Sequence, residues 1–186
     1  RPRESEHQAL HNLAEMEDKI KLLKEKADRF SRYQQLFDAQ PLARWQELGQ
    51  LTELFDARKA VWTLLQEYDN KRRTWYETPV GQLDAEEIQT SVKEMHQRSN
   101  RLLGLMKDKG FVDSVAAEVE TSIKQMKKEF LPVIVDCANP DLTKDHWDRI
   151  LQKLPTADGA KQFRETLCLD ELSGYGVFEN PGVVAS

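Results

Sequence analysis

Histidines are the side chains in this sequence whose spacing could support chemistry. His7 and His11 lie four residues apart, so on a helix both would face one side and could bind a zinc ion. A helical zinc site of the H-E-x-x-H type needs Glu at position 8, where the chain has Gln8, and no third ligand stands out. We therefore interpret His7 and His11 as surface residues near a terminus and expect no metal site.

A further histidine has acidic neighbours. His146 lies within a few residues of carboxyl groups that could form an acid–base pair with it, namely Asp141, Asp145 and Asp148. No nucleophile, oxyanion donor or glycine-rich loop accompanies this group in the sequence. We therefore expect His146 and Trp147 to pack against the preceding helix. A small enzyme that uses His146 is the most distant function that we consider.

The remaining reactive groups do not indicate catalysis. Cys137 and Cys168 stand in unrelated contexts without a basic partner that would mark a reactive thiolate, and we interpret both as reduced thiols of an intracellular protein. The chain contains no G-x-x-x-x-G-K-[ST] segment, so it lacks a phosphate cradle of that kind. We expect no enzyme activity and no cofactor within these residues.

Charge and hydropathy exclude two classes of partner. The 186 residues include 27 basic and 32 acidic side chains, interspersed to a net charge of −5, so a basic face for nucleic acid is not evident. No apolar run approaches the roughly 18–20 residues that a membrane helix needs. The N-terminus, Arg-Pro-Arg-Glu, carries no secretory signal, and we expect the sequence to be a piece of a longer protein.

Helical periodicity runs through most of the chain. Apolar residues recur at three- or four-residue intervals, and no segment shows the sustained alternation of a half-buried strand. Breaks fall at Pro41, at Pro79 and at Gly110, which can adopt the left-handed conformation that ends a helix. We predict helices over about residues 4–38, 41–77, 84–110, 111–138 and 140–154.

Local signals add detail to these helices. Glu87 follows Asp84 by three residues, a pattern similar to a capping box at a helix start. Pro132 should kink the fourth helix or end it a turn early. Asn139 can cap the fifth helix, and Pro140 fits its first position because no N–H is missed there. The second helix has an aromatic-rich stripe: Trp45, Leu48, Leu51, Phe55, Trp62, Leu65, Tyr68 and Trp75.

These patterns predict an all-α fold, an elongated antiparallel helical bundle with an irregular C-terminal tail, similar to spectrin repeats. Heptad-like spacing alone is also compatible with a coiled coil, but the tryptophans and the breaks favour a folded-back bundle. We divide the chain into a bundle over 1–138, a shorter helical region over 139–172 and a loop or disordered tail over 173–186. Asp158-Gly159 indicates a turn, followed by a short helix over 162–167 or an extended piece over 163–169.

One motif resembles a known family. Residues 139–147 read Asn-Pro-Asp-Leu-Thr-Lys-Asp-His-Trp, similar to the signature N-P-x-L-R-D-R-H-W of dynein heavy chains, where the tail meets the linker. Other family features follow in the same order between about Leu51 and Val184: Trp62, Trp75, Thr78-Pro79 and the segment 83–88, then the helix with Pro132. The sequence of residues 61–79 is more similar to axonemal than to cytoplasmic heavy chains.

The match is incomplete. Asp145 stands where the family usually has Arg, and Thr143 and Lys144 replace Arg and Asp. Within 166–172, Asp170 stands where Gly is usual. The resemblance therefore implies that any charge contact of the family's arginine is rewired here, and Lys144 is the candidate for it. The residues that carry the structural family motif are Trp62, Trp75, Pro79, Pro132, Asn139, Pro140, His146 and Trp147.

The resemblance implies a non-catalytic segment where the tail bundles end and the linker begins. The parent would be an ATP-driven, minus-end-directed microtubule motor of cilia or flagella, with ATP, Mg²⁺ and microtubules bound only by domains outside this chain. The implied partners are the rest of the heavy chain, and further heavy, intermediate or light chains. The implied location is the axonemal cytoskeleton. The alternative is a free-standing spectrin-like scaffold that binds partner proteins.

Overall fold

A computed structural model describes residues 3–37, 44–154 and 163–184. Within these ranges the chain is helical and contains no strand, only an isolated antiparallel bridge between Pro79 and Cys168. The all-α prediction is confirmed. The elements are α1 (Arg3–Leu36), α2 (Arg44–Glu77), the 3₁₀ turn η1 (Val80–Gln82), α3 (Ala85–Asp108), α4 (Ser114–Gln125), the π-helical turn η2 (Met126–Phe130), α5 (Leu131–Cys137), α6 (Lys144–Lys153), α7 (Leu169–Gly174) and the 3₁₀ turn η3 (Pro181–Val183).

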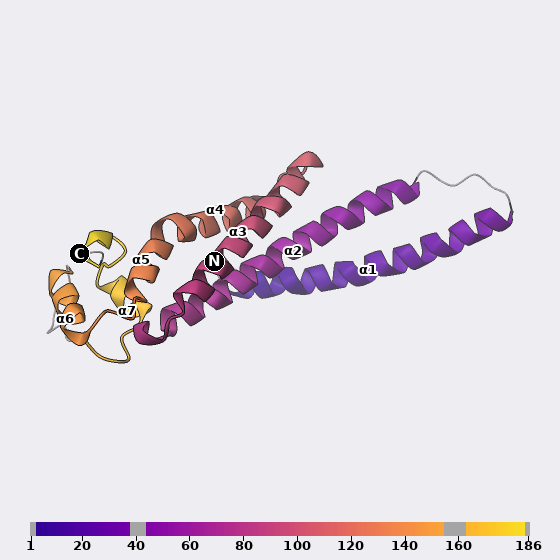
Figure 1. The fold of residues 1–186 in the computed structure, drawn as a ribbon. Coiled ribbons are helices and arrows are strands. Elements are labelled where there is room, and N and C mark those ends of the chain that lie inside the picture. Colours follow the sequence, from indigo (N-terminus) through magenta and orange to yellow (C-terminus); the bar gives the residue numbers. More distant parts are fainter. Residues whose placement is uncertain (1–2, 38–43, 155–162, 185–186) are drawn as a thin grey trace.

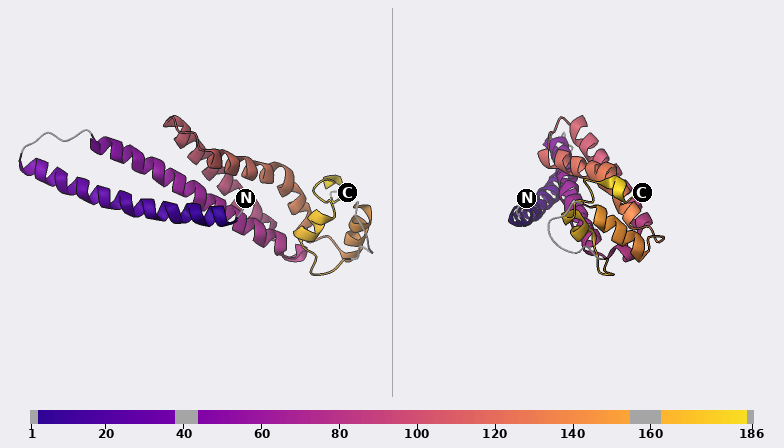
Figure 2. Two further views of the ribbon diagram at one scale, coloured as in Figure 1. Left: turned by 180° about the vertical axis from the view of Figure 1, so that it is seen from behind. Right: turned by 90° about the vertical axis from the view of Figure 1, so that its left-hand side faces the viewer.

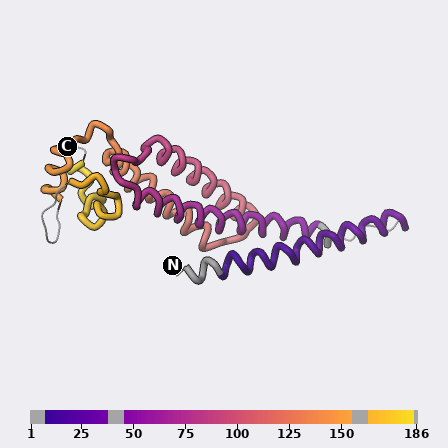
Figure 3. The backbone as a smooth tube through the Cα atoms, turned by 90° about the horizontal axis from the view of Figure 1, so that it is seen from below, coloured from indigo at the N-terminus to yellow at the C-terminus, as the bar shows by residue number. Residues whose placement is uncertain are grey.

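The helices form an elongated antiparallel bundle (Figure 1). Helices α1 and α2 make a long hairpin, and α3 and α4 pack beside the C-terminal half of α2. Figure 2 shows that α6, α7 and the C-terminal turns gather at the end of the bundle where α2 meets α3. Seen from below, the α1–α2 hairpin extends well beyond α3 and α4 (Figure 3). No described helix has an apolar stretch long enough to cross a membrane.

Helix α2 buries side chains on more than one face, because α1 lies on one side of it and α3 and α4 on the other. Phe55, Tyr68 and Trp75 of the predicted stripe are buried, but Leu51 is 55% exposed. The stripe missed Val61 and Leu64, which are among the most buried residues of the chain. A single stripe therefore describes α2 only in part, since a helix with neighbours on two sides needs two apolar faces.

The predicted ends of α3 are confirmed. The Asp84 side chain accepts a hydrogen bond from the Glu87 amide at 2.9 Å, which caps the start of the helix. At the other end Gly110 has a φ of 70°, and the Phe111 amide donates to the Met106 carbonyl at 2.9 Å. This left-handed glycine closes the helix, a conformation that a residue with a Cβ adopts only at a cost.

Helix α4 begins at Ser114, three residues after the predicted start at 111, because Asp113 caps it. The Asp113 carboxylate accepts from the Val115 and Ala116 amides at 2.8 and 3.1 Å, and it pairs with Arg58 of α2 at 3.3 Å. The Asp113 side chain is only 3% exposed; its cap bonds fix the start of α4, and its ion pair with Arg58 ties that start to α2.

Replacing Asp113 separates these two contributions. We expect Asp113→Ala to lower the free energy of unfolding by about 1–2 kcal/mol, because it removes the cap acceptor from a buried helix start. Asp113→Asn keeps an oxygen for the two amides and should cost less. Urea unfolding of both variants measures the difference, and equal losses would mean that the cap contributes nothing beyond the charge pair with Arg58.

The helix break near Pro132 is confirmed. Residues 126–130 form a π-helical turn between α4 and α5, and the two helices run in different directions in Figure 1. Pro132 follows directly, at the start of α5. Proline lacks the N–H that an α-helix needs and its ring crowds the carbonyl four residues earlier, so a wider turn relieves the clash. The bend therefore has a sequence cause.

The predicted helix start at Asn139 is wrong. The Asn139 side chain accepts from the Asp141 amide at 3.0 Å and its carbonyl accepts from the Leu142 amide at 3.2 Å, so Asn-Pro forms a tight turn. Helix α6 starts four residues later, behind Thr143. Asn and Pro favour a turn as strongly as a helix start, because Asn bonds its own backbone and Pro sets the φ that either structure needs.

Near the C-terminus neither alternative is correct: residues 165 and 166 form a turn in which the Leu167 amide donates to the Arg164 carbonyl at 2.9 Å, and Leu169 already belongs to α7. Residues 163–167 contain no helix, and Cys168 pairs with Pro79 before α7 begins at Leu169. Helix α7 itself was not predicted, although acidic residues 170 and 171 in its first turn and Gly176 after its end are boundary signals. Val177 and Val184 of the tail are buried. The predicted break at Pro41 and the predicted turn at 158–159 lie outside the described residues.

Candidate functional site: the joint between the bundle and the C-terminal segment

The best-defined site is where residues 163–184, which we call the C-terminal segment, meet the end of α2 and the bend between α4 and α5. We call this contact the joint. The Val80 amide donates to the Leu167 carbonyl at 2.8 Å, beside the bridge between Pro79 and Cys168. Pro79 has no amide hydrogen, so its neighbour Val80 makes the bond. A backbone clasp thus joins two parts of the chain that are far apart in sequence.

Aromatic rings form the next layer of the joint. The Phe178 ring stacks on Tyr76 of α2 with centroids 5.8 Å apart, and it meets Phe130 of the π-helical turn edge-on at 5.1 Å. Arg72 lies over the Tyr76 ring at 5.3 Å. Each such ring contact contributes about 0.5–1.5 kcal/mol beyond its buried area. Phe178 therefore ties the C-terminal segment to α2 and to the bend at the same time.

Helix α6 reaches the joint through Trp147, which is 3% exposed and stacks on Phe163 at 5.9 Å. The Phe163 amide donates to Asp148 at 2.9 Å, so α6 fixes the start of the C-terminal segment. The burial predicted for Trp147 is confirmed. The packing predicted for His146 is wrong, because that residue is exposed. Adjacent helical residues point about 100° apart, so both cannot face the core.

His146 has a structural task instead. Its Nδ1 accepts a hydrogen bond from the Thr143 amide at 3.2 Å, which makes it the third-position partner in the capping box of α6. Asp145 is exposed in the first helical turn, where negative charge is favourable. No described residue forms an ion pair with Lys144, so the predicted rewiring through Lys144 has no contact to support it.

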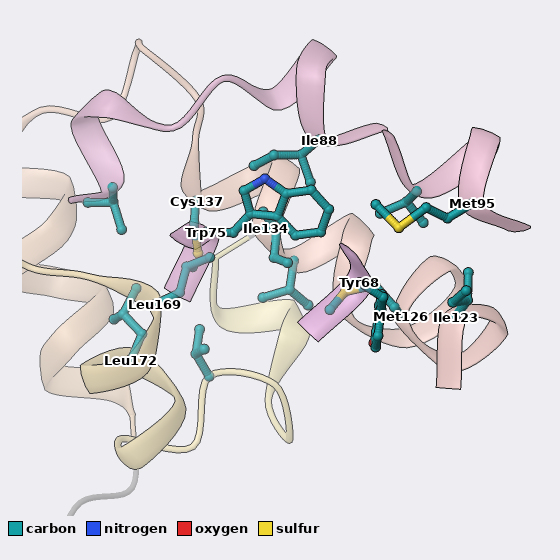
Figure 4. Close-up of a cluster of buried hydrophobic side chains, with 14 of the residues drawn as sticks. Tyr68, Trp75, Ile88, Met95, Ile123, Met126, Ile134, Cys137, Leu169 and Leu172 are labelled. Carbon is teal, nitrogen blue, oxygen red and sulfur yellow. The ribbon is translucent and has the colours of Figure 1, made fainter. Parts of the chain in front are cut away.

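Trp75 anchors α2 to α3 and α5 (Figure 4). Its ring is buried with Ile88, Ile134 and Cys137 around it, and its indole N–H donates to Glu87 at 3.3 Å. The Glu87 carboxylate also accepts from Lys71 at 3.0 Å and from Ser91 at 2.7 Å. The one polar atom of the buried indole is therefore satisfied by a carboxylate at the exposed edge of the core.

This network changes the acidity of Glu87. Burial alone would raise the pKa of the Glu87 carboxyl, but hydrogen bonds from Ser91 and Lys71, the charge of Lys71 and the Trp75 bond outweigh it, so the pKa lies below its ordinary value. Because folding lowers this pKa, the carboxylate stabilises the fold above its unfolded pKa. That contribution is lost as the pH falls through the folded value.

Glu87→Gln tests this linkage. We expect wild-type stability to fall more steeply than that of Glu87→Gln as the pH is lowered from about 6 to about 3, because only the wild type must protonate a stabilised carboxylate. Chemical unfolding across this range measures the slope. The neighbouring exposed Glu86→Gln is the control and should follow the wild type. Parallel curves for Glu87→Gln and the wild type would contradict the network.

Trp62 and Trp75 belong to the predicted stripe of α2, but their rings do not lie on one face of the helix. Trp62 is half-buried beside Leu13 and Phe55 in a groove between α1 and α2, away from the joint. Thirteen helical residues turn through about 220° beyond three full circles, so the two rings leave α2 on nearly opposite sides. The two tryptophans therefore lie in different environments: Trp62 at the groove and Trp75 in the buried core.

The cysteines and histidines show no arrangement for catalysis or metal binding in the described part of the chain. Burial, with a smaller effect of the Asp136 charge, raises the pKa of the Cys137 thiol to about 12, so this thiol stays protonated. The His11 Nε2 atom lies 3.4 Å from Glu15 Oε1, and the side chain of His7 is not among those that the structure describes. Among the described residues no group of three potential metal ligands comes together.

The fold and the joint define an α-helical structural segment, built from packing contacts and hydrogen bonds. Comparison with known protein families identifies the family of this segment: the family model of the dynein heavy chain, N-terminal region 2, matches residues 48–183. This match covers well over half of the sequence, and the chain belongs to the dynein heavy chain family. The predicted resemblance is confirmed, and the matched region is the N-terminal one.

The relatives are axonemal heavy chains. The chain is 20% identical over 142 residues to dynein axonemal heavy chain 1 of Mus musculus, an alignment that covers 76% of this chain and 3% of the relative. It is 26% identical over 159 residues to dynein axonemal heavy chain 6 of Homo sapiens, covering 84% and 4%. For dynein axonemal heavy chain 2 of Mus musculus the identity is 22% over 178 residues, covering 95% and 4%. The chain thus spans a small fraction of each relative.

Proposed function

We propose that this chain is the mechanical link between the tail and the linker of an axonemal dynein heavy chain. The parent in this proposal is an ATP-driven, minus-end-directed microtubule motor of cilia or flagella. The chain itself performs no chemistry, and ATP and Mg²⁺ act in parts of the motor outside it. Its immediate partner is the rest of the heavy chain, and other heavy chains and intermediate or light chains are further partners in the axoneme.

The observation that carries the proposal is the joint. The clasp of Val80 on Leu167 and the stacking of Phe178 on Tyr76 hold the C-terminal segment to the bundle at separate points. Two elements that touch at separate points cannot rotate freely about either one. A load applied to the C-terminal segment is therefore passed to α2 rather than absorbed by a loose connection.

The core behind the joint continues this load path. One cluster of buried side chains runs from α2 through α3 and α4 to α5, α6 and α7. Close-packed interiors deform little, so a displacement at one end of such a cluster is transmitted to the other. The bend at the π-helical turn before Pro132 sets the direction in which α5 leaves α4. These features suit a rigid link better than a flexible tether.

Weakening the joint in the full-length motor tests the proposal. Phe178→Ala removes two ring contacts of about 0.5–1.5 kcal/mol each, which shifts the docking of the C-terminal segment by roughly 5- to 150-fold. We expect microtubule gliding to slow while ATP hydrolysis without microtubules stays unchanged. The reason is that the altered residue lies in the link and the hydrolytic machinery remains intact.

A matched control excludes a general effect of truncating an apolar residue. Val112 is 90% exposed in the loop between α3 and α4, away from the joint, so Val112→Ala should glide like the wild type. Gliding that is unchanged in Phe178→Ala would contradict the mechanical role. Equal slowing in both variants would contradict it as well, because the effect would then not depend on the joint.

A further inference from the structure

Helix α1 carries a row of large apolar side chains that the described part of the chain leaves uncovered. Met16, Leu23 and Phe30 follow one another at seven-residue intervals and are 53%, 49% and 55% exposed. Leu13 and Ala27, three residues before two of them, are only 7% exposed. Helix α1 therefore has two adjacent apolar rows with heptad spacing, a buried row and an exposed row. One row packs on α2, and the other faces solvent.

One end of the exposed row, at Met16, borders a groove. Between α1 and α2 lies a depression of about 390 Å³, lined by Leu13 and Met16 of α1 and by Leu51 and Trp62 of α2. Leu51 is itself 55% exposed. A face this apolar over several turns is uncommon on a surface that stays in water, and it marks a place where another element packs. The seven-residue spacing indicates that this element is a helix.

Charges on α1 differ between its two sides. On the side of α2, Glu17 pairs with Lys59 at 2.6 Å. On the other side, Lys19 and Lys26 each stand three residues after a member of the exposed row, so they flank it. Neither lysine forms an ion pair with a described residue. The exposed row is therefore apolar with a positively charged edge.

We propose that an amphipathic helix with an acidic edge, supplied by another part of the same heavy chain, packs along the exposed row and over the groove at its Met16 end, and completes a three-helix bundle with α1 and α2. Its apolar residues repeat every seven positions against the exposed row, and its Asp or Glu residues face Lys19 and Lys26. From Met16 to Phe30 the row spans about 21 Å at 1.5 Å per residue, so the partner helix has at least roughly 15 residues.

Charge and chain length decide between the candidate occupants. A second copy of α1 on the exposed row would bring Lys19 and Lys26 against the same lysines, which is unfavourable. The relatives extend far beyond the matched part, since the alignment with heavy chain 6 covers only 4% of that protein. A helix on the same polypeptide has a high effective concentration and needs little intrinsic affinity. The inference uses family membership and does not depend on the mechanical role.

Zero-length carbodiimide crosslinking of the intact motor tests the proposal, because this reagent joins a lysine to a carboxylate only when the two are in contact. We expect Lys19 and Lys26 to be joined to Asp or Glu residues of an amphipathic helical segment elsewhere in the same heavy chain. Lys21 is the control, since it lies about 200° around α1 from Lys19 and should not form such a product. Mass spectrometry of the crosslinked peptides identifies the partner.

Other outcomes overturn the proposal. These are no crosslink to Lys19 or Lys26, a crosslink to a different subunit, or a crosslink between copies, recognised by mixing isotopically labelled and unlabelled protein. A charge reversal gives a second readout in the intact motor. Lys26→Glu should lose the crosslink and make α1 more susceptible to limited proteolysis, whereas Lys21→Glu should match the wild type. Because both lysines are exposed, neither variant disturbs folding, and equal behaviour of the two would also overturn the proposal.

Discussion

Trp75→Ala should lower the free energy of unfolding by about 3–5 kcal/mol, whereas Trp62→Ala should cost much less. The Trp75 ring is 5% exposed and lies between α2, α3 and α5, so its removal leaves a cavity that the neighbouring helices cannot close. It also removes the indole donor from the Glu87 carboxylate. Trp62 is half-buried at an open groove, where water can replace the lost ring.

The comparison of these two variants is informative because both change the same residue type in the same helix. Differences in the unfolded state therefore largely cancel, and the difference reports the two environments. Urea unfolding followed by circular dichroism gives both free energies. A similar loss in both variants would mean that the core behind the joint is no more tightly packed than the groove, and it would remove one support for a rigid link.

Helices and their ends were the features most accessible to prediction, because they depend on local chemistry. The apolar spacing of residues 4–38 and 41–77 predicts the two helices now seen as α1 and α2. Asp84 and Glu87 mark the start of α3, and Gly110 marks its end, since each acts on backbone groups within a few residues. Local signals of this kind do not depend on what packs against the helix.

Features set by tertiary packing were predicted less well. Periodicity located an apolar stripe on α2 but not its second face, formed by Val61 and Leu64, because that face depends on where α3 and α4 lie. The start of α6 was misplaced because Asn139-Pro140 serves a turn as readily as a helix. His146 and Trp147 were both predicted to pack against the preceding helix, although adjacent helical positions point in different directions.

The joint itself could not be predicted from sequence. It depends on contacts such as Val80 with Leu167 and Tyr76 with Phe178, whose partners are far apart along the chain and share no complementary pattern. The family motif pointed to the right region because Pro79 and Trp147 belong to it. Its residues gave no indication that the C-terminal segment folds back onto α2.

Leu172→Asp should detach the C-terminal segment while leaving the bundle folded. Leu172 is fully buried in α7, and an aspartate there must either bury an unpaired charge or leave the core. The first choice costs about 4 kcal/mol or more, which exceeds what a six-residue helix can supply on its own. The clasp on Val80 and the stacking of Phe178 should be lost together, because both belong to the segment that leaves.

Hydrogen exchange locates the effect. In Leu172→Asp we expect the amides of Val80 and Val177 to lose protection while that of Val92, in the core of α3, keeps it. Ser173→Asp, at the adjacent exposed position, is the control and should exchange like the wild type. Loss of protection at Val92 as well would show that bundle and joint unfold as one unit. The C-terminal segment would then be part of the core of the bundle rather than a separate element docked on it, and the link would have to act through the whole fold.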